Sequence, residues 1–509
     1  MTTTANPRAF SGWTRQRFGP FLGLSAQQAC LLAVMLAPLL LAMAQGRWVL
    51  LGVLVAASVP VALVVVLPVR GRPAYRWLVD LCWFGLGRLA GWAFWRSKAV
   101  AGASTPEELD TPDLPGVLTS LAFHDGPAFG PFQRRVGVVA DPHEGLWTAT
   151  GRISHPGLGT ASADARDAAA DALGALLAGA ALTHQIARIS LYVRTVPSDG
   201  AERAAWVDDH EVADVPAVVI EAGKLLEASM LTASVRHELF VTVTVSEAKI
   251  RKQATEAGRG VSGRARVLYR NLETIEQALR EIGATDVEWL TTEQLAEAIR
   301  TGYSPADQAV LERSRQDTAR NRFAVVGVPL AAAGPTTAPS PSARRYHHDS
   351  YTTVSYAVLL PELQTQVGAL ARMLAPSEAG ERRCLAMHYE PIGAERSRKR
   401  IERSSWAMEV ADEAKRSRGF RTDRRHERRL RETSDQEEQI SAGHSLVRVA
   451  IAAAVTVPAD WAVEDYAARF EGDGRACGFV PLRADLAQDS AFVAACLPLG
   501  IGLRSREDR

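Results

Sequence analysis

Three glycines in the stretch GRGVSG, at positions 258, 260 and 263, have the spacing of a loop that cradles phosphate. In a dinucleotide-binding fold this loop follows the tip of a buried strand and delivers the pyrophosphate to the next helix N-terminus. Here the preceding residues, SEAKIRKQATEA, are polar and charged, and the nearest predicted strand ends near Ser246. We therefore interpret the glycines as a flexible surface loop before a helix over 264–282.

Other catalytic signatures are missing from the sequence. The Gly223-Lys224 pair is followed by Leu225, so no P-loop is present, and neither H-E-x-x-H nor G-x-S-x-G occurs. His347, His348 and Asp349 are adjacent, which favours an exposed polar start of a strand over a metal site. We expect no catalytic residue, metal or cofactor, although a membrane-tethered enzyme with a site assembled from distant residues stays open.

Composition sets the broad class. The chain has 509 residues, with 58 basic and 57 acidic side chains, so net charge indicates no partner and two or three domains are expected. The five cysteines are scattered and never form a C-x-x-C pair. This pattern favours a reducing compartment for most of the chain.

Two apolar runs near the N-terminus predict membrane helices. Residues 48–67 form 20 residues without a charge, enough to cross a hydrocarbon core of about 30 Å, and 29–44 form a second uncharged run. We expect a two-helix transmembrane hairpin within residues 1–73. Arginines flank the pair on both sides (Arg8, Arg15 and Arg17 before it; Arg70, Arg72 and Arg76 after it), and only Arg47 lies in the turn. Both ends are therefore predicted in the cytoplasm, at the plasma membrane.

Residues 74–100 are rich in aromatic and basic side chains. We expect this segment to lie in the membrane interface with its tryptophans at headgroup depth. The residues predicted at the interface are Trp77, Trp83, Trp92, Trp95, Arg70, Arg72 and Arg76. A third spanning helix is the alternative, which Asp80 and Arg88 disfavour because each costs about 2.5–3.5 kcal/mol near the bilayer centre.

The remaining chain alternates predicted strands and helices. We expect a membrane-anchored α+β protein with two mixed α/β blocks, 101–330 and 346–509, separated by a Pro/Ala/Ser-rich linker at 331–345. The two blocks have a similar alternation of predicted strands and helices, but their sequences do not align as clear repeats. In the first, Asp141 to Gly145 join two β-rich runs as a hairpin.

A basic run extends from Glu395 to Arg431, with 14 basic and 7 acidic residues. It is either a solvated helix with internal ion pairs or an interaction surface for lipid, a protein or nucleic acid. Its few aromatic residues disfavour base stacking, so direct nucleic-acid binding is left open. The candidate surface residues are Arg396, Arg398, Lys399, Arg400, Arg424, Arg425, Arg428 and Arg429.

Two regions carry a family resemblance. The N-terminal apolar pair with its tryptophan- and arginine-rich segment resembles the PrgI-like membrane subunits of conjugation systems. The stretch 427–457, followed by 477–503, resembles the end of the N-terminal, non-ATPase domain of VirB-type conjugation ATPases. The matching residues are Gly443-His444, Gln488, Ala491-Phe492 and Leu497-Pro498-Leu499-Gly500.

Together these regions look like an actinobacterial membrane protein family of conjugation and type IV secretion systems. The resemblance implies a non-catalytic inner-membrane component that anchors a separate P-loop ATPase and contacts channel subunits, with homo-oligomerisation open. The alternative is the type VII secretion membrane subunit EccE, which also has two N-terminal spans and a cytoplasmic α and β domain. Neither reading identifies the cargo as DNA or protein.

Overall fold

The computed structural model divides the chain into two compact units. It describes residues 8, 10, 26–69, 72–102, 105, 111–197, 207, 210, 215–231, 235–320, 327–337, 339–361, 364–393, 395, 397, 438 and 445–503. One unit comprises residues 1–11, 94–398 and 438–509, and we call it the sheet unit. The other, 12–93 with 399–437, is called the apolar unit.

The described part of the apolar unit is mostly helical. Its helices are α1 (Ala26–Ala44), α2 (Trp48–Val66) and α3 (Ala74–Ala90). A short antiparallel pair of strands, β1 (Pro68–Val69) and β2 (Arg72–Pro73), lies between α2 and α3. The amide of Gln28, at the start of α1, donates to the carbonyl of Val65 at the end of α2 over 2.7 Å.

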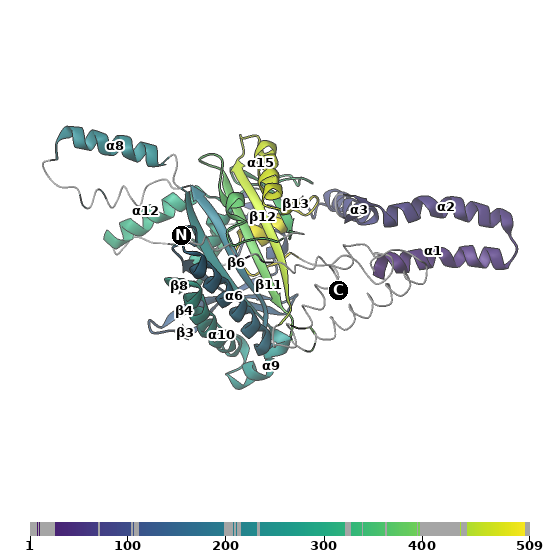
Figure 1. Ribbon diagram of the computed structural model, residues 1–509, viewed down its shortest axis with the longest axis horizontal. Helices are drawn as coiled ribbons and strands as arrows, with labels where there is room; N and C mark the ends of the chain where they lie inside the picture. The colour runs from purple at the N-terminus through teal and green to yellow at the C-terminus, as the bar shows by residue number, and fades with distance from the viewer. Residues whose placement is uncertain are drawn as a thin grey trace, which may run out of the picture. The chain divides into compact units, whose positions relative to one another are not determined.

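An 11-stranded sheet, all of whose pairings are antiparallel, dominates the sheet unit (Figure 1). Its main path runs β13-β10-β12-β11-β6-β7-β5-β4-β3, with β8 paired to β5 and β9 to β10. In chain order, the first seven strands of this sheet are β3 (Ala122–Phe129), β4 (Arg134–Asp141), β5 (Leu146–Ser154), β6 (Ile186–Pro197), β7 (Val235–Ser246), β8 (Asp286–Trp289) and β9 (Tyr346–His348). The last four are β10 (Tyr351–Leu359), β11 (Arg382–Pro391), β12 (Val447–Pro458) and β13 (Val480–Arg483).

This sheet overturns the predicted fold class. Strand β6, from the first predicted block, pairs with β11, from the second, in a register from Cys384 opposite Arg194 to Tyr389 opposite Ile189. The two blocks therefore share one continuous sheet instead of forming separate α/β layers. Within the predicted linker 331–345, Ala333 is fully buried in the core.

Strands β6 and β11 pair where the two halves of the sheet meet, and we call this pair the seam. Read outward from the seam, the two halves have the same strand order. In one half the order is β6-β7-β5-β8, and in the other it is β11-β12-β10-β13. In each half the third strand in chain order (β7 or β12) lies between the second (β6 or β11) and the first (β5 or β10). The fourth strand (β8 or β13) pairs with the outer edge of the first. The first half has the β-α-β-β-α-β arrangement of a split βαβ unit, with β4 and β3 added beyond β5. In the second half the 3-10 turn η3 (Ala371–Leu374) stands in place of the first helix.

Helices cover both faces of the sheet. On one face α6 (Ala163–Thr183), α9 (Glu247–Glu256) and α10 (Gly260–Ile282) pack on the first half, and α15 (Val463–Ala476) packs on the second beside the 3-10 turn η3 (Ala371–Leu374). On the opposite face, α11 (Thr292–Tyr303), α16 (Gln488–Cys496) and the 3-10 turns η1 (Gly116–Leu118) and η2 (Leu330–Ala332) enclose a third core. The remaining helices among the described residues of this unit are α4 (Lys98–Ala101), α8 (Ala217–Leu231) and α12 (Asp307–Arg320).

The assignment of faces follows from the alternation of side chains along β6 and β11. Tyr192 and Ala386 lie opposite each other and belong to the core under α11 and α16. Leu385, one residue earlier, belongs to the core under α15. Successive residues of a strand point to opposite faces, so each seam strand contributes to cores on both sides.

Local predictions of secondary structure are largely confirmed. The predicted hairpin is β4 and β5, where the Asp141 carboxylate accepts from the backbone N–H of His143 over 3.0 Å and closes the turn. Between β10 and β11 the described residues form no α-helix and contain the short turn η3. The predicted start of the helix at Arg264 also changes, since α10 begins at Gly260.

The GRGVSG stretch is a tight corner between two helices. The charged residues before it form α9, which ends at Glu256, and α10 begins four residues later. Gly260 has φ 58°, a left-handed conformation that favours glycine, and a Cβ on Gly263 would lie 2.2 Å from the carbonyl oxygen of Ala254. The glycines therefore permit a close helix–helix approach, and the interpretation as a loop is corrected.

Candidate functional surfaces and buried arginine networks

Helix α2 is the described helix that is long and apolar enough to cross a membrane. It runs from Trp48 to Val66, and its most apolar 18-residue window is 6% buried. The preceding helix contributes only the shorter apolar run Gln28–Ala44. The predicted transmembrane hairpin of two spanning helices is therefore wrong, and one candidate span replaces it.

The predicted interface tryptophans lie on α3 and just after it. Trp83 and Trp92 are 57% and 62% exposed, and their rings stack with centroids 6.0 Å apart. The indole N–H of Trp77 donates to the carbonyl of Val69 over 3.0 Å, which ties α3 to β1. Trp95 is half-buried and belongs to the sheet unit. The structure thus gathers three of the four tryptophans on the apolar unit, and their depth in a membrane stays a prediction.

The predicted arginines are described only in part. Arg76 lies on α3, and its Nε donates to the Tyr75 hydroxyl over 3.3 Å. Arg72 lies in β2, and Arg70 falls outside the described residues. The basic candidates Arg396, Arg398, Lys399, Arg400, Arg424, Arg425, Arg428 and Arg429 also fall outside them.

The residues that carry the C-terminal resemblance hold the last helix on the sheet. Gln488 is buried, and its amide oxygen accepts from the backbone N–H of Ser355 over 2.8 Å. Phe492 is fully buried beside Tyr303, with ring centroids 5.2 Å apart. Beyond the helix, the carbonyl of Pro498 accepts from the Thr150 hydroxyl over 2.7 Å. This segment thus crosses from one half of the sheet to the other. Gly443 and His444 lie outside the described residues.

A buried ion pair lies beneath this segment, and sequence analysis missed it. Arg194 of β6 is fully buried, and its Nη2 is 2.8 Å from the Glu238 carboxylate of β7. The guanidinium also donates to the Ala298 carbonyl of α11 over 2.7 Å and stacks on Phe240 at 4.6 Å. Burial lowers the pKa of Arg194, and the charge of Glu238 opposes this shift. Burial also raises the pKa of Glu238, but the positive charges of Arg194 and Arg382 outweigh burial, so the pKa of this carboxyl lies below its ordinary value.

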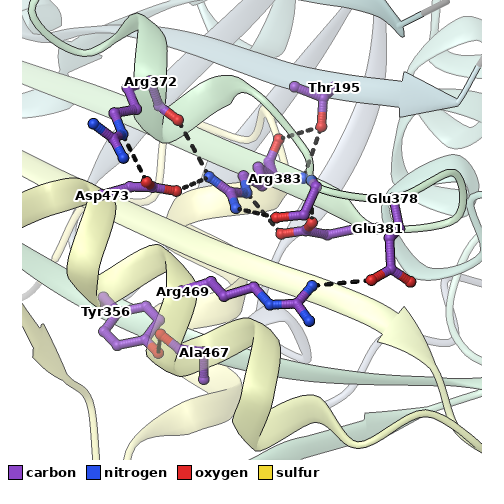
Figure 2. Close-up of polar contacts among 10 residues, drawn as sticks. Thr195, Tyr356, Arg372, Glu378, Glu381, Arg383, Ala467, Arg469 and Asp473 are labelled. Atoms are coloured by element: carbon purple, nitrogen blue, oxygen red, sulfur yellow. Dashed lines mark hydrogen bonds and ion pairs between the residues drawn. The ribbon is translucent and has the colours of Figure 1, made fainter. Parts of the chain in front are cut away.

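A second buried arginine, Arg383, lies on the opposite face of the sheet, the face of Leu385. Figure 2 shows its contacts. Arg383 of β11 is fully buried, and its Nε donates to the Glu381 carboxylate over 2.7 Å. Its Nη1 donates to Asp473 of α15 over 2.8 Å, and Arg372 reaches the same carboxylate at the same distance (Figure 2). The network therefore binds η3, β11 and α15 together.

Thr195 joins this network to the other half of the sheet. Its hydroxyl accepts from the backbone N–H of Arg383 over 2.7 Å and donates to the carbonyl of the same residue over 3.1 Å (Figure 2). An arginine at an inward-facing position of an apolar strand, as in SLYVRTV, is the sequence signal that could have found these networks.

Two buried histidines complete the polar contacts across the layers. His388 of β11 contacts the Ser190 hydroxyl of β6 over 2.9 Å and the Ala494 carbonyl of α16 over 3.0 Å. His348 contacts the Tyr303 carbonyl over 2.6 Å and the Thr353 hydroxyl over 2.7 Å. Burial lowers the pKa of each histidine to about 3, so both are neutral. The expectation that His348 begins a strand in an exposed position is wrong.

In the described ranges, no group of three or more His, Cys, Asp or Glu side chains is placed to hold a metal ion. A cavity of about 490 Å³ lies beside α9 and α10. Its walls include Gln185, Gln253 and Asn271, and the amides of these residues bond to one another over 2.8 and 3.0 Å.

Comparison with known proteins adds no family to this picture. No protein-family model matches the chain, and no curated protein matches it significantly.

Proposed function

We propose that this protein is a non-catalytic structural component of a conjugation-like type IV secretion apparatus and holds a separate ATPase at the plasma membrane. The observation that carries the proposal is the presence on one chain of a helix able to span a membrane, α2, and of the C-terminal pattern Gln488 to Gly500. That pattern resembles the end of the non-ATPase domain of VirB-type ATPases, and its described residues fix α16 on the sheet.

A single span through α2 still suggests an orientation. Arg70, Arg72 and Arg76 follow the helix closely, whereas Arg47 is the one basic residue in the twenty residues before it. The positive-inside rule then places the chain after α2 in the cytoplasm. The free state of all five cysteines is consistent with a reducing compartment.

The sheet unit is suited to bind partners through its surface. Its three cores lie on both faces of one sheet and meet at the seam, where Arg194 and Arg383 hold helices from both halves. Buried polar networks with satisfied partners keep a scaffold rigid. A rigid scaffold keeps its binding surfaces preorganised and so lowers the entropic cost of binding a partner.

Purification of the tagged protein from native membranes after mild cross-linking tests this function. We expect mass spectrometry to find a conjugation-type P-loop ATPase with channel subunits. The matched control carries Val53→Arg and Val59→Arg in α2, which should remove the protein from the membrane fraction. Type VII core subunits in the eluate would favour the EccE-like alternative instead, and an eluate without secretion subunits would contradict both.

A further inference from the structure

Two cysteines that are distant in sequence lie in one core of the sheet unit. Cys384 of β11 and Cys496 at the end of α16 are both fully buried among the side chains under α11 and α16. Cys30 and Cys82, in contrast, are exposed helix residues of the apolar unit, and Cys477 is partly buried at the end of α15. The folded sheet therefore brings together two of the five cysteines.

Small side chains let α16 lie close to the strands at this point. The core between α16 and strands β11 and β12 contains the alanines Ala386, Ala452, Ala454, Ala494 and Ala495. Because methyl groups fill little space between a helix and a sheet, the backbones approach closely and short side chains meet. Cys496 is accordingly the side chain that interacts most strongly with the Cys384 thiol. The two thiols are therefore direct neighbours.

Two buried arginines flank the cysteine pair. Cys384 lies opposite Arg194 in the register of the seam, and Arg382 precedes it by two residues on β11, on the same face. Nη1 of Arg194 lies 3.4 Å from the carbonyl oxygen of Cys496. Nη1 of Arg382 donates to the Thr301 carbonyl, whereas its Nε and Nη2 have no nitrogen or oxygen partner among the described residues. Two guanidinium groups and two thiols thus share a site shielded from water.

This site holds more positive than negative charge if both thiols are neutral. Arg194 is paired with the Glu238 carboxylate at 2.8 Å, whereas the oxygen partners of Arg382 are uncharged backbone carbonyls at the end of α11. A buried charge without a counter-ion is strongly unfavourable. A thiolate at Cys384, on the same strand face as Arg382, supplies the missing negative charge.

The surroundings also make the two thiols chemically unequal. Burial raises the pKa of Cys384, but contact with the second thiol and the positive charges of the two arginines outweigh burial, so this pKa lies below its ordinary value. Burial raises the pKa of Cys496 well above its ordinary value. The site therefore places a thiolate beside a thiol that keeps its proton. These are the two groups from which a sulfenic acid and then a disulfide form.

We propose that Cys384 and Cys496 form a redox site that closes as a disulfide between β11 and α16 in the presence of a peroxide. The Cys384 thiolate attacks one oxygen of hydrogen peroxide, and the other oxygen leaves as hydroxide, which yields a sulfenic acid at Cys384. The Cys496 sulfur then displaces the sulfenic hydroxyl, which leaves as water with the thiol proton. The two sulfurs lose two electrons in total, and the peroxide gains them.

The disulfide would fix the last helix on the sheet, and a dithiol reductant would release it. Because both thiols are shielded from solvent, a small neutral peroxide is the oxidant that suits the site, and bulky thiol reagents are excluded. The redox site does not depend on the proposed secretion function.

Peroxide treatment of the full-length protein in detergent micelles tests the site. After treatment near neutral pH, free thiols are blocked with N-ethylmaleimide in denaturant, and proteolytic peptides are analysed by mass spectrometry. We expect the peptide that contains Cys384 to be linked to the peptide that contains Cys496. The melting temperature should rise on oxidation and fall back with dithiothreitol, because a cross-link restricts the unfolded chain.

Serine variants separate the roles of the two thiols. In Cys496→Ser, oxidation of Cys384 should stop at the sulfenic acid, which dimedone added with the denaturant traps. In Cys384→Ser, Cys496 should be oxidised at least about tenfold more slowly than Cys384 is in the wild type. Cys477 is the matched control, because it is more accessible but burial raises its pKa. It should therefore react more slowly than Cys384.

Three results would overturn the proposal. They are a Cys384–Cys496 pair that stays reduced while Cys477 is oxidised, a linked peptide that forms only after the chain is unfolded, and Cys496 in Cys384→Ser that reacts as fast as Cys384 does in the wild type. Unchanged circular dichroism of the reduced variants controls for folding. If a variant does not fold, the order in which Cys384 and Cys477 react in the wild type still decides.

Discussion

The guanidinium of Arg194 and the carboxylate of Glu238 lie 2.8 Å apart in an ion pair between neighbouring strands, with the arginine wholly shielded from solvent. Removal of one partner leaves an uncompensated buried charge, which typically costs about 3–5 kcal/mol. We therefore expect Glu238→Gln to lower the free energy of unfolding by about that amount in urea titrations of the purified protein.

The exposed pair Arg8–Asp171 is the matched control for that substitution. Its side chains are 46% and 67% exposed. Because exposed pairs contribute about 0–1 kcal/mol, Asp171→Asn should change stability by less than about 1 kcal/mol. Equal losses in the two variants would show that the Arg194 pair is not buried as described.

The acid dependence of stability should follow from His388. Its pKa is about 3 in the folded chain and about 6.5 when unfolded, so between these values the unfolded state binds more protons. Stability should therefore be fully present above pH 6.5 and fall as pH decreases towards 3, by up to about 1.4 kcal/mol per pH unit for this side chain. His348 contributes in the same direction.

The variant His388→Gln separates this contribution from the others. It should flatten the pH dependence of the unfolding free energy between pH 4 and 6 by about 1.4 kcal/mol per pH unit. Denaturant titrations at several pH values measure the slope. A slope unchanged from the wild type would mean that His388 is protonated in the folded protein.

The helix corner at Gly263 should tolerate no side chain. A Cβ there would lie 2.2 Å from the Ala254 carbonyl oxygen, so Gly263→Ala should destabilise the protein by about 1–3 kcal/mol. Gly174 in α6 is the control, because nothing lies within 4 Å of its added Cβ. Gly174→Ala should be neutral or stabilise by up to about 1 kcal/mol, since alanine favours helix. Thermal melting of both variants measures these effects. Similar melting temperatures for Gly263→Ala and Gly174→Ala would contradict the close approach of the two helices at Gly263.

The shared sheet predicts that the two halves stay together after the chain is cut. We expect a protease site inserted after Ser340, an exposed position, to yield two fragments that co-elute in size exclusion. The reason is that β6 and β11 pair along the seam and α16 packs on strands of both halves. If the two fragments separate without denaturant, the shared sheet is contradicted and the prediction of two independent blocks is supported.

The sequence predicted the separate elements well because their signals are local. Apolar alternation and turn residues located the hairpin of β4 and β5, and the helical period located most of α10. Pairing between β6 and β11 is not a local signal, since about 190 residues separate the paired positions. The predicted fold class was wrong for this reason.

The buried networks escaped prediction for a related reason. Charged residues in sequence are normally assigned to the surface, and the partners Arg194 and Glu238 are 44 residues apart. Only the assembled sheet shows that both side chains lie under α11 and α16. The transmembrane prediction was half correct, because α2 alone among the described helices meets the length and apolarity of a span.

Recruitment of the ATPase to the membrane tests the central claim most directly. The measurement is the fraction of the conjugation-type ATPase in the membrane pellet of native cells that lack this protein, complemented by the wild type or by the Val53→Arg/Val59→Arg variant. The account predicts that the ATPase leaves the membrane without the protein, returns with the wild type and fails to return with the variant. An ATPase that stays in the membrane fraction in all three strains would contradict it.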